Sequence, residues 1–247
     1  MTRWQAAGRH LLISATVALP ILILMSWVWY PPPLFLAAGA AKLALTIIGV
    51  DVVVGPLLTL IVYKHGKRGM RFDLWVIGLL QLAALTFGLH VSVDSRPAYI
   101  VATPGAAVLV HANELYYGSG PGPDRLETPP LWGPRTVVAL TGRTPEEKQA
   151  LILDLMAGLP DVEYRPERYR DLSDFFDELA PTATPLERLA KQDREAAERI
   201  ALWLDDHGYP ADARLLALPL LTRNRELALV LDPSRRSAAG LLDVVVE

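Results

Sequence analysis

The chain contains no cysteine, and this absence removes several kinds of chemistry. Disulfide bonds, thiolate metal sites and a cysteine nucleophile are all excluded. The compartment is left open, because a domain outside the cytoplasm can fold without disulfides. Histidine is also scarce, since only His111 and His207 follow residue 95.

Recognisable catalytic motifs are missing as well. The sequence has no His-x-x-x-His pair, no Gly-x-Ser-x-Gly segment and no glycine-rich phosphate loop. It therefore predicts no catalytic residue, no metal site and no cofactor. We expect a protein that is not an enzyme.

A basic surface is missing from the larger part of the chain. Residues 95–247 hold 17 Lys and Arg against 24 Asp and Glu, a formal net charge of −7. Binding to nucleic acid phosphates requires a basic face, so we expect no nucleic acid partner.

Three apolar stretches stand out instead, at residues 11–30, 43–63 and 74–93. Each is about 20 residues long, which suffices for a helix to cross about 30 Å of hydrocarbon. The first is longer than the apolar part of a usual signal peptide, and no small-x-small cleavage site follows it. We therefore expect a retained anchor of three membrane-spanning helices at residues 1–94, in contact with the lipid bilayer.

The basic residues of this region predict its orientation. Arg3 and Arg9 precede the first stretch, residues 64–71 carry four positive charges, and the loop between the first two stretches carries only Lys42. Short basic loops stay in the cytoplasm. The pattern predicts a cytoplasmic N-terminus and, after three spans, residues 95–247 outside, which in a two-membrane bacterium is the periplasm.

Residues 95–247 predict a small α+β domain. Strands are expected at 96–101, 107–111 and 135–140, with a Pro104-Gly105 turn between the first two and a Gly- and Pro-rich loop at 118–133. Thr144, Pro145 and Glu147 form a capping box that begins a helix ending near Gly158.

Further helices are expected at residues 166–179, which are rich in charge, and from about Thr184 to Gly208, where apolar residues recur at helical spacing. The chain then returns to β structure. Short apolar runs at 214–221, 226–231 and 241–246 predict a C-terminal antiparallel β meander.

The second apolar stretch carries one acid in its middle, Asp51. A carboxylate in a bilayer is costly, so it is either paired or functional. Gly49 and Gly55 allow another helix to approach closely, and Pro56 frees a backbone carbonyl and bends the helix. Asp51 could therefore receive a cation or an amine from a partner helix. Alternatively, the three helices satisfy it internally through side chains of Ser14, Thr16, Thr46 or Gln81.

Several segments of residues 3–100 carry a resemblance to a known family. They are Arg3-Trp4, Ala6-Ala7-Gly8, His10-Leu11-Leu12-Ile13-Ser14, Trp29-Tyr30-Pro31, Gly49-Val50-Asp51-Val52, Gly55-Pro56-Leu57-Leu58-Thr59, Phe72-Asp73-Leu74, Leu80-Gln81-Leu82-Ala83-Ala84-Leu85 and Arg96-Pro97-x-Tyr99. In these segments the chain resembles the TfpX/TfpZ type IV pilin accessory proteins.

The resemblance implies a non-enzymatic inner-membrane protein that associates with a particular major pilin and helps its assembly or display, as a dedicated chaperone would. We therefore expect the partner helix to dock near Gly49, Asp51, Gly55, Pro56 and Gln81. The alternative is a membrane-anchored sensor whose periplasmic domain binds a ligand, although only the short N-terminal segment and residues 64–71 would face a cytoplasmic output.

Overall fold

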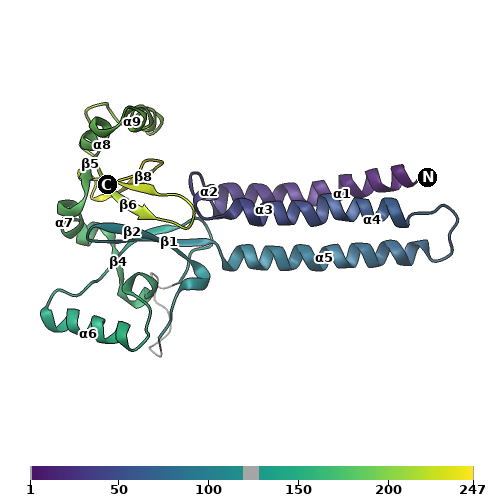
Figure 1. The fold of residues 1–247 in the computed structure, drawn as a ribbon, viewed down its shortest axis with the longest axis horizontal. Helices are drawn as coiled ribbons and strands as arrows, with labels where there is room; N and C mark the ends of the chain where they lie inside the picture. The colour runs from purple at the N-terminus through teal and green to yellow at the C-terminus, as the bar shows by residue number, and fades with distance from the viewer. Residues whose placement is uncertain (1, 119–127, 247) are drawn as a thin grey trace. The chain divides into compact units, whose positions relative to one another are not determined.

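The structure is a computed structural model that describes residues 2–118 and 128–246. The chain divides into two compact units, Met1–Arg96 and Pro97–Glu247. The first is built from helices and the second from a mixed sheet with helices around it (Figure 1). The predicted fold class, three apolar helices followed by an α+β domain, is confirmed.

Three helices of the first unit are long and apolar enough to cross a membrane: Arg3–Trp29, Ala40–Val62 and Met70–Asp94. The first is α1 (Arg3–Leu24) continued by the π-helical segment η1 (Met25–Trp29). The second is α3 (Ala40–Ile48), the π-helical segment η2 (Gly49–Val54) and α4 (Gly55–Val62). The third is α5 (Met70–Asp94).

These helices run alongside one another (Figure 1), and α1 packs closely against α4 and η2. The short helix α2 (Leu34–Ala37) joins the first span to the second. Tyr30 fixes the end of the first span to the end of α5, because its hydroxyl donates to the carbonyl of Ser95 at 3.0 Å. Tyr30 is only 1% exposed, so this bond is shielded from solvent.

The second unit contains an eight-stranded sheet in the order β4-β3-β1-β2-β6-β7-β8, with β5 paired to β6. The strands are β1 (Pro97–Thr103), β2 (Ala106–His111), β3 (Arg135–Ala139), β4 (Tyr169–Asp171), β5 (Thr184–Pro185), β6 (Leu216–Leu221), β7 (Leu227–Asp232) and β8 (Ser237–Leu242). Strands β6, β7 and β8 form the predicted C-terminal antiparallel meander.

Two parallel pairings connect the parts of this sheet. β1 pairs with β2 as an antiparallel hairpin around Gly105, whose φ of 97° is accessible to glycine, and with β3 in parallel. β2 then pairs with β6 in parallel over two residues. Every residue of β1 and β7 is buried, as expected for strands with neighbours on both edges.

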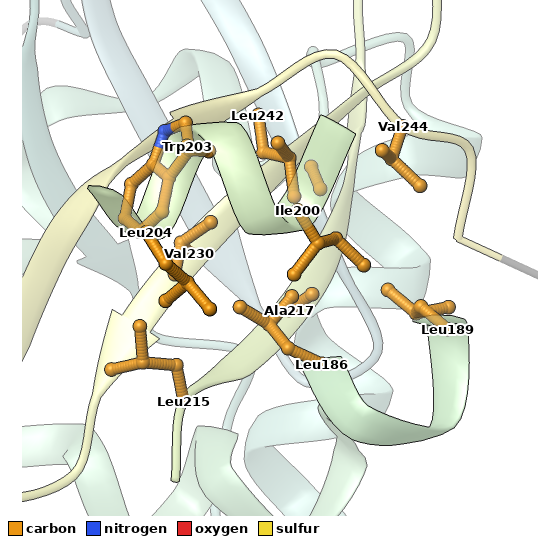
Figure 2. Close-up of a cluster of buried hydrophobic side chains, with 11 residues drawn as sticks. Leu186, Leu189, Ile200, Trp203, Leu204, Leu215, Ala217, Val230, Leu242 and Val244 are labelled. Atoms are coloured by element: carbon orange, nitrogen blue, oxygen red, sulfur yellow. The ribbon is translucent and has the colours of Figure 1, made fainter. Parts of the chain in front are cut away.

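Helices α8 (Leu186–Gln192) and α9 (Arg194–Asp206) pack on the meander and form one hydrophobic core. Figure 2 shows Trp203 and Ile200 of α9 above Ala217 and Val230 of the strands, with Leu189 of α8 at the side. A second core lies between β1, β2, β3 and β4, where the rings of Tyr99 and Tyr169 are 4.9 Å apart. Helix α6 (Pro145–Met156) contributes Leu151 to it.

Some predicted elements differ from the structure. The expected helix at 166–179 is wrong over most of its length: it contains short 3-10 turns (Pro166–Arg168 and Leu172–Phe175), the strand β4, and only the one-turn helix α7 (Phe176–Leu179). The helix expected from Thr184 to Gly208 is two helices, because Asp193 has an extended backbone and caps α9. The last strand begins and ends earlier than the predicted 241–246. Residues 119–127 of the expected loop lie outside the described residues.

Candidate functional site

The candidate site lies in the middle of the second span, where the helix widens into the π-helical segment η2. The amide of Gly55 donates to the carbonyl of Val50, five residues earlier, which is the π-helical spacing. The same spacing would pair the carbonyl of Asp51 with the nitrogen of residue 56. Residue 56 is proline and has no N–H, so this carbonyl has no donor within its own helix.

Gln81 of α5 supplies the missing donor. Its side-chain nitrogen Nε2 donates to the carbonyl oxygen of Asp51 at 3.0 Å. The prediction that Pro56 frees a carbonyl thus has a definite counterpart in the structure, in which a side chain from the third span replaces the lost backbone bond. Such a bond joins the second and third spans in a region where water would not compete for it.

Gly55 makes room for this contact. A Cβ atom on residue 55 would lie 1.9 Å from Nε2 of Gln81 and 2.4 Å from its Cδ. Gly55 and Pro56 are both buried inside the helical unit. Gly49 is different, because a Cβ atom there would meet nothing within 4 Å. Of the predicted docking residues, the structure therefore brings together Asp51, Gly55, Pro56 and Gln81, and leaves Gly49 apart.

The carboxylate of Asp51 is not satisfied by the internal partners that the sequence suggested. Gln81 contacts the backbone of Asp51, whereas Thr16 and Thr46 donate to carbonyls of their own helices, those of Leu12 and Lys42. The Asp51 side chain is 5% exposed, and its Oδ1 atom has no hydrogen-bond partner among the described residues.

Asp51 faces a cavity of about 240 Å³ between α1, η2 and α5. Its lining contains four polar residues, His10, Ser14, Asp51 and Gln81, among apolar and small ones, Ile13, Val17, Ala18, Gly78, Leu82 and Leu85. His10 also holds the first span against the second, because its Nδ1 atom lies 2.5 Å from the hydroxyl of the buried Thr59. His10 and Ser14 both belong to α1 and both line the cavity. The sequence indicates that they share one face of the helix, because they are four residues apart.

Asp51 also borders a second cavity of about 190 Å³ between α3, η2 and α5. Apart from Asp51 and Thr46, its lining is apolar. Since the Thr46 hydroxyl already donates to the Lys42 carbonyl at 2.9 Å, this second cavity offers fewer polar contacts than the first.

In the soluble unit, both histidines and Glu114 make contacts within the fold. His111 is 2% exposed, and Glu114 accepts hydrogen bonds from its amide and its Nδ1 at 2.8 and 2.9 Å. Burial alone would raise the pKa of Glu114, but the hydrogen bonds from His111 and Arg223 outweigh this effect and lower the pKa to about 2. His207 stacks on Trp203 with ring centres 4.0 Å apart. In residues 2–118 and 128–246 no three His, Asp or Glu side chains gather as a metal site would require.

Comparisons with known proteins identify relatives of one kind. The chain is 27% identical over 185 residues, 74% of its length and 72% of the relative's, to "Fimbrial assembly protein, serogroup E1" of Dichelobacter nodosus. It is 38% identical over 99 residues, covering 76% of the relative, to "Fimbrial assembly protein, serogroups C1 and C2" of the same organism. A 37% identical serogroup I counterpart is matched over 38% of its own length. Neither a protein-family model nor a solved structure matches the chain.

Proposed function

Because the chain belongs to the family of fimbrial assembly proteins, we propose that it is a type IV pilus assembly accessory that binds the major pilin and helps its assembly or stability. In this role it acts as a chaperone-like partner and not as an enzyme. The observation that carries the proposal is the 38% identity to a fimbrial assembly protein over 76% of that protein's length.

The residues of the chain support the finer assignment. The segments around Trp29, Asp51 and Gln81 resemble the TfpX/TfpZ pilin accessory proteins. This resemblance implies an inner-membrane protein that associates with one particular major pilin. Pilins await assembly in that membrane, anchored by one hydrophobic helix with the globular head in the periplasm. A protein with three candidate spans and a folded soluble unit has the parts needed to contact both regions.

Charge supports the placement that this role requires. The basic segment at residues 64–71 lies in the connection between α4 and α5, and Arg3 and Arg9 lie in the first turns of α1. Basic residues next to membrane spans favour the cytoplasmic side. With three spans, the soluble unit then lies in the periplasm, where the pilin heads are.

We propose a role other than catalysis, and the contacts made by the two histidines of the soluble unit are compatible with it. A general base needs a nitrogen within reach of a reacting group. His111 is instead buried against Glu114, and the Nδ1 of His207 lies 2.8 Å from the Trp203 carbonyl. Both side chains hold local structure, which suits a binding protein.

The test is a pull-down of the tagged full-length protein from its own host in mild detergent, probed for the major pilin. We expect the pilin to co-purify, and an equally tagged membrane protein of unrelated family to leave it behind. Deleting the gene should also reduce surface pili, and plasmid-borne protein should restore them. Absence of pilin from an intact, folded bait, together with normal piliation of the deletion strain, would contradict the proposal.

A further inference from the structure

One end of the helical unit collects most of its positive charge. The start of α1 at Arg3, the end of α4 at Val62 and the start of α5 at Met70 lie at this end (Figure 1). The contact between His10 and Thr59 holds the first turns of α1 beside the last turn of α4. Six of the eight Lys and Arg residues in the unit belong to this end: Arg3, Arg9, Lys64, Lys67, Arg68 and Arg71.

This charge is not neutralised within the helical unit. Asp73 is the one acid at this end, and Lys67 pairs with it at 2.6 Å. Six positive charges against one negative charge leave an excess of five. The acidic soluble unit is attached at the opposite end of α5, 25 residues away, which is about 37 Å along the helix. The remaining five basic side chains are exposed and form no ion pair among the described residues: Arg3, Arg9, Lys64, Arg68 and Arg71.

Exposed aromatic rings place these charges at the level of lipid headgroups. Trp4 of α1 is 70% exposed, and Phe72 and Trp75 of α5 are 72% and 78% exposed. Tryptophan is enriched where a membrane meets water, with its ring among the headgroups. Trp4 follows Arg3, and Phe72 follows Arg71, so the guanidinium groups lie at the depth of the headgroup phosphates.

An apolar strip continues from the basic end along α5. Arg71, Trp75, Leu79 and Leu82 recur at helical spacing and therefore share one face of the helix. All four side chains are exposed, and Leu79 and Leu82 also line a shallow groove further along α5. A cation followed by an apolar strip matches the two parts of a phospholipid, its headgroup and its acyl chains. A soluble anion, or an acidic segment of another protein, would use the charge but not the strip.

The start of α5 also has space for a phosphate. No side chain caps its first amides, and the preceding residue, Gly69, has a φ of 86° and open space where a Cβ atom would lie. Amides at a helix start favour anions, and guanidinium groups such as those of Arg68 and Arg71 bind phosphate through two hydrogen bonds. The start of α1 differs, because Thr2 and Gln5 close it with a capping box.

We propose that the start of α5 binds an anionic phospholipid, whose phosphate is held by Arg68 and Arg71. One acyl chain lies along Trp75, Leu79 and Leu82. A headgroup without an amine is preferred, because an amine would add to the excess of positive charge. A second copy of the chain is a poor partner for this surface, since like charges repel. The inference goes beyond the proposed function and holds whichever side of the membrane this end faces.

The test mixes the purified full-length protein in detergent with phosphatidylglycerol or phosphatidylcholine of identical acyl chains, and native mass spectrometry counts the lipids retained. We expect phosphatidylglycerol to be retained about tenfold more strongly. Arg68→Gln combined with Arg71→Gln should abolish this preference, whereas Arg68→Lys combined with Arg71→Lys should keep part of it. The control Lys42→Gln removes an exposed charge near the start of α3, at the other end of the unit, and should change nothing.

Three results would overturn the inference. Equal retention of the two lipids by the natural protein would remove the preference for an anionic headgroup. A preference that survives in the double glutamine variant, or that is lost equally in Lys42→Gln, would remove the site at the start of α5. Displacement of phosphatidylglycerol by millimolar inorganic phosphate would assign the charge to a free anion and not to a lipid. Thermal unfolding of each variant in detergent without added lipid shows that it is folded.

Discussion

At the scale of single residues, two acids differ in how their carboxylates are paired: the half-buried Glu114 and the buried Asp51. Glu114 in the soluble unit has both carboxylate oxygens occupied, one by His111 and the other by Arg223. Asp51 in the second span has a buried oxygen without a partner. The first arrangement stabilises a fold, because it favours the charged form of the acid. The second leaves a buried polar atom without a hydrogen bond.

The pKa of Glu114 makes the stability of the soluble unit depend on pH. Because its pKa falls from 4.5 to about 2 on folding, the ionised side chain adds stability at all pH values above 4.5, and this is lost as the pH falls from 4.5 toward 2. The side chain is 26% exposed, so we expect about 1–2 kcal/mol, less than the full shift would give. Pulse proteolysis in urea, compared at pH 7 and pH 3, measures it.

The matched control for this prediction is Glu114→Gln, which keeps a hydrogen-bonding side chain but cannot ionise. This variant should be less stable than the natural protein at pH 7 and should lose less stability on acidification. Identical pH profiles for the two proteins would show that Glu114 does not carry the effect.

Sequence alone could place Asp51 and Gln81 in adjacent spans, but it could not pair Glu114 with Arg223. Those two residues are separated by 109 positions, and neither lies in a recognisable motif. The contact between Gln81 and Asp51 was among the sequence-based alternatives, yet the atoms involved differ. Only the combination of a π-helical turn with Pro56 determines that the carbonyl, and not the carboxylate, receives the donor.

At the scale of helices and strands, the second and third spans are joined by the hydrogen bond from Gln81 to the Asp51 carbonyl. This contact requires a glycine at residue 55, because any larger residue would occupy the space of the Gln81 side chain. Gln81 reaches the second span because residue 55 is glycine. The close approach and the hydrogen bond therefore depend on each other, and substitutions at the two positions should not have additive effects.

A double-mutant cycle tests this dependence. Gly55→Ala should push the Gln81 side chain away and leave the Asp51 carbonyl unpaired, which in a membrane costs about 1 kcal/mol. In a Gln81→Ala background the obstacle is gone, and the same Gly55→Ala change should be neutral or stabilising because alanine is the better helix former. Reversible unfolding in bicelles measures both. Equal effects in the two backgrounds would exclude the coupling.

The elements that sequence predicted wrongly have tertiary causes. Residues 166–179 are charged and suit a helix locally, but Tyr169 is buried beside Tyr99 and its strand pairs with β3. Burial of a large aromatic side chain outweighs a weak local preference. The break at Asp193 has a local cause instead: its side chain accepts from the amides of Glu195 and Ala196, as helix caps do.

At the scale of the whole molecule, sequence predicted the order of the parts better than their connections. Three apolar stretches and a C-terminal meander follow from local patterns, and the structure contains both. The parallel pairing of β2 with β6 joins residues 107–108 to residues 220–221. Such a pairing depends on packing over more than a hundred residues, and no local pattern encodes it.

The orientation of the molecule can be measured directly because the natural chain has no cysteine. His65 lies in the basic connection between α4 and α5, and Asp212 lies in an exposed turn of the soluble unit. In spheroplasts, a membrane-impermeant maleimide should label Asp212→Cys at once and His65→Cys only after the membrane is opened. The reverse pattern would contradict a periplasmic soluble unit.

The end of the last strand of the sheet is covered by contacts from helix α9. Trp203 donates to the carbonyl of Leu241 at 2.8 Å, and Arg199 donates to that of Asp243 at the same distance. An open sheet edge can recruit a strand from another chain, and occupied carbonyls prevent this. Helix α9 thus covers this stretch of the sheet border, so its carbonyls are not available to pair with a strand of another chain.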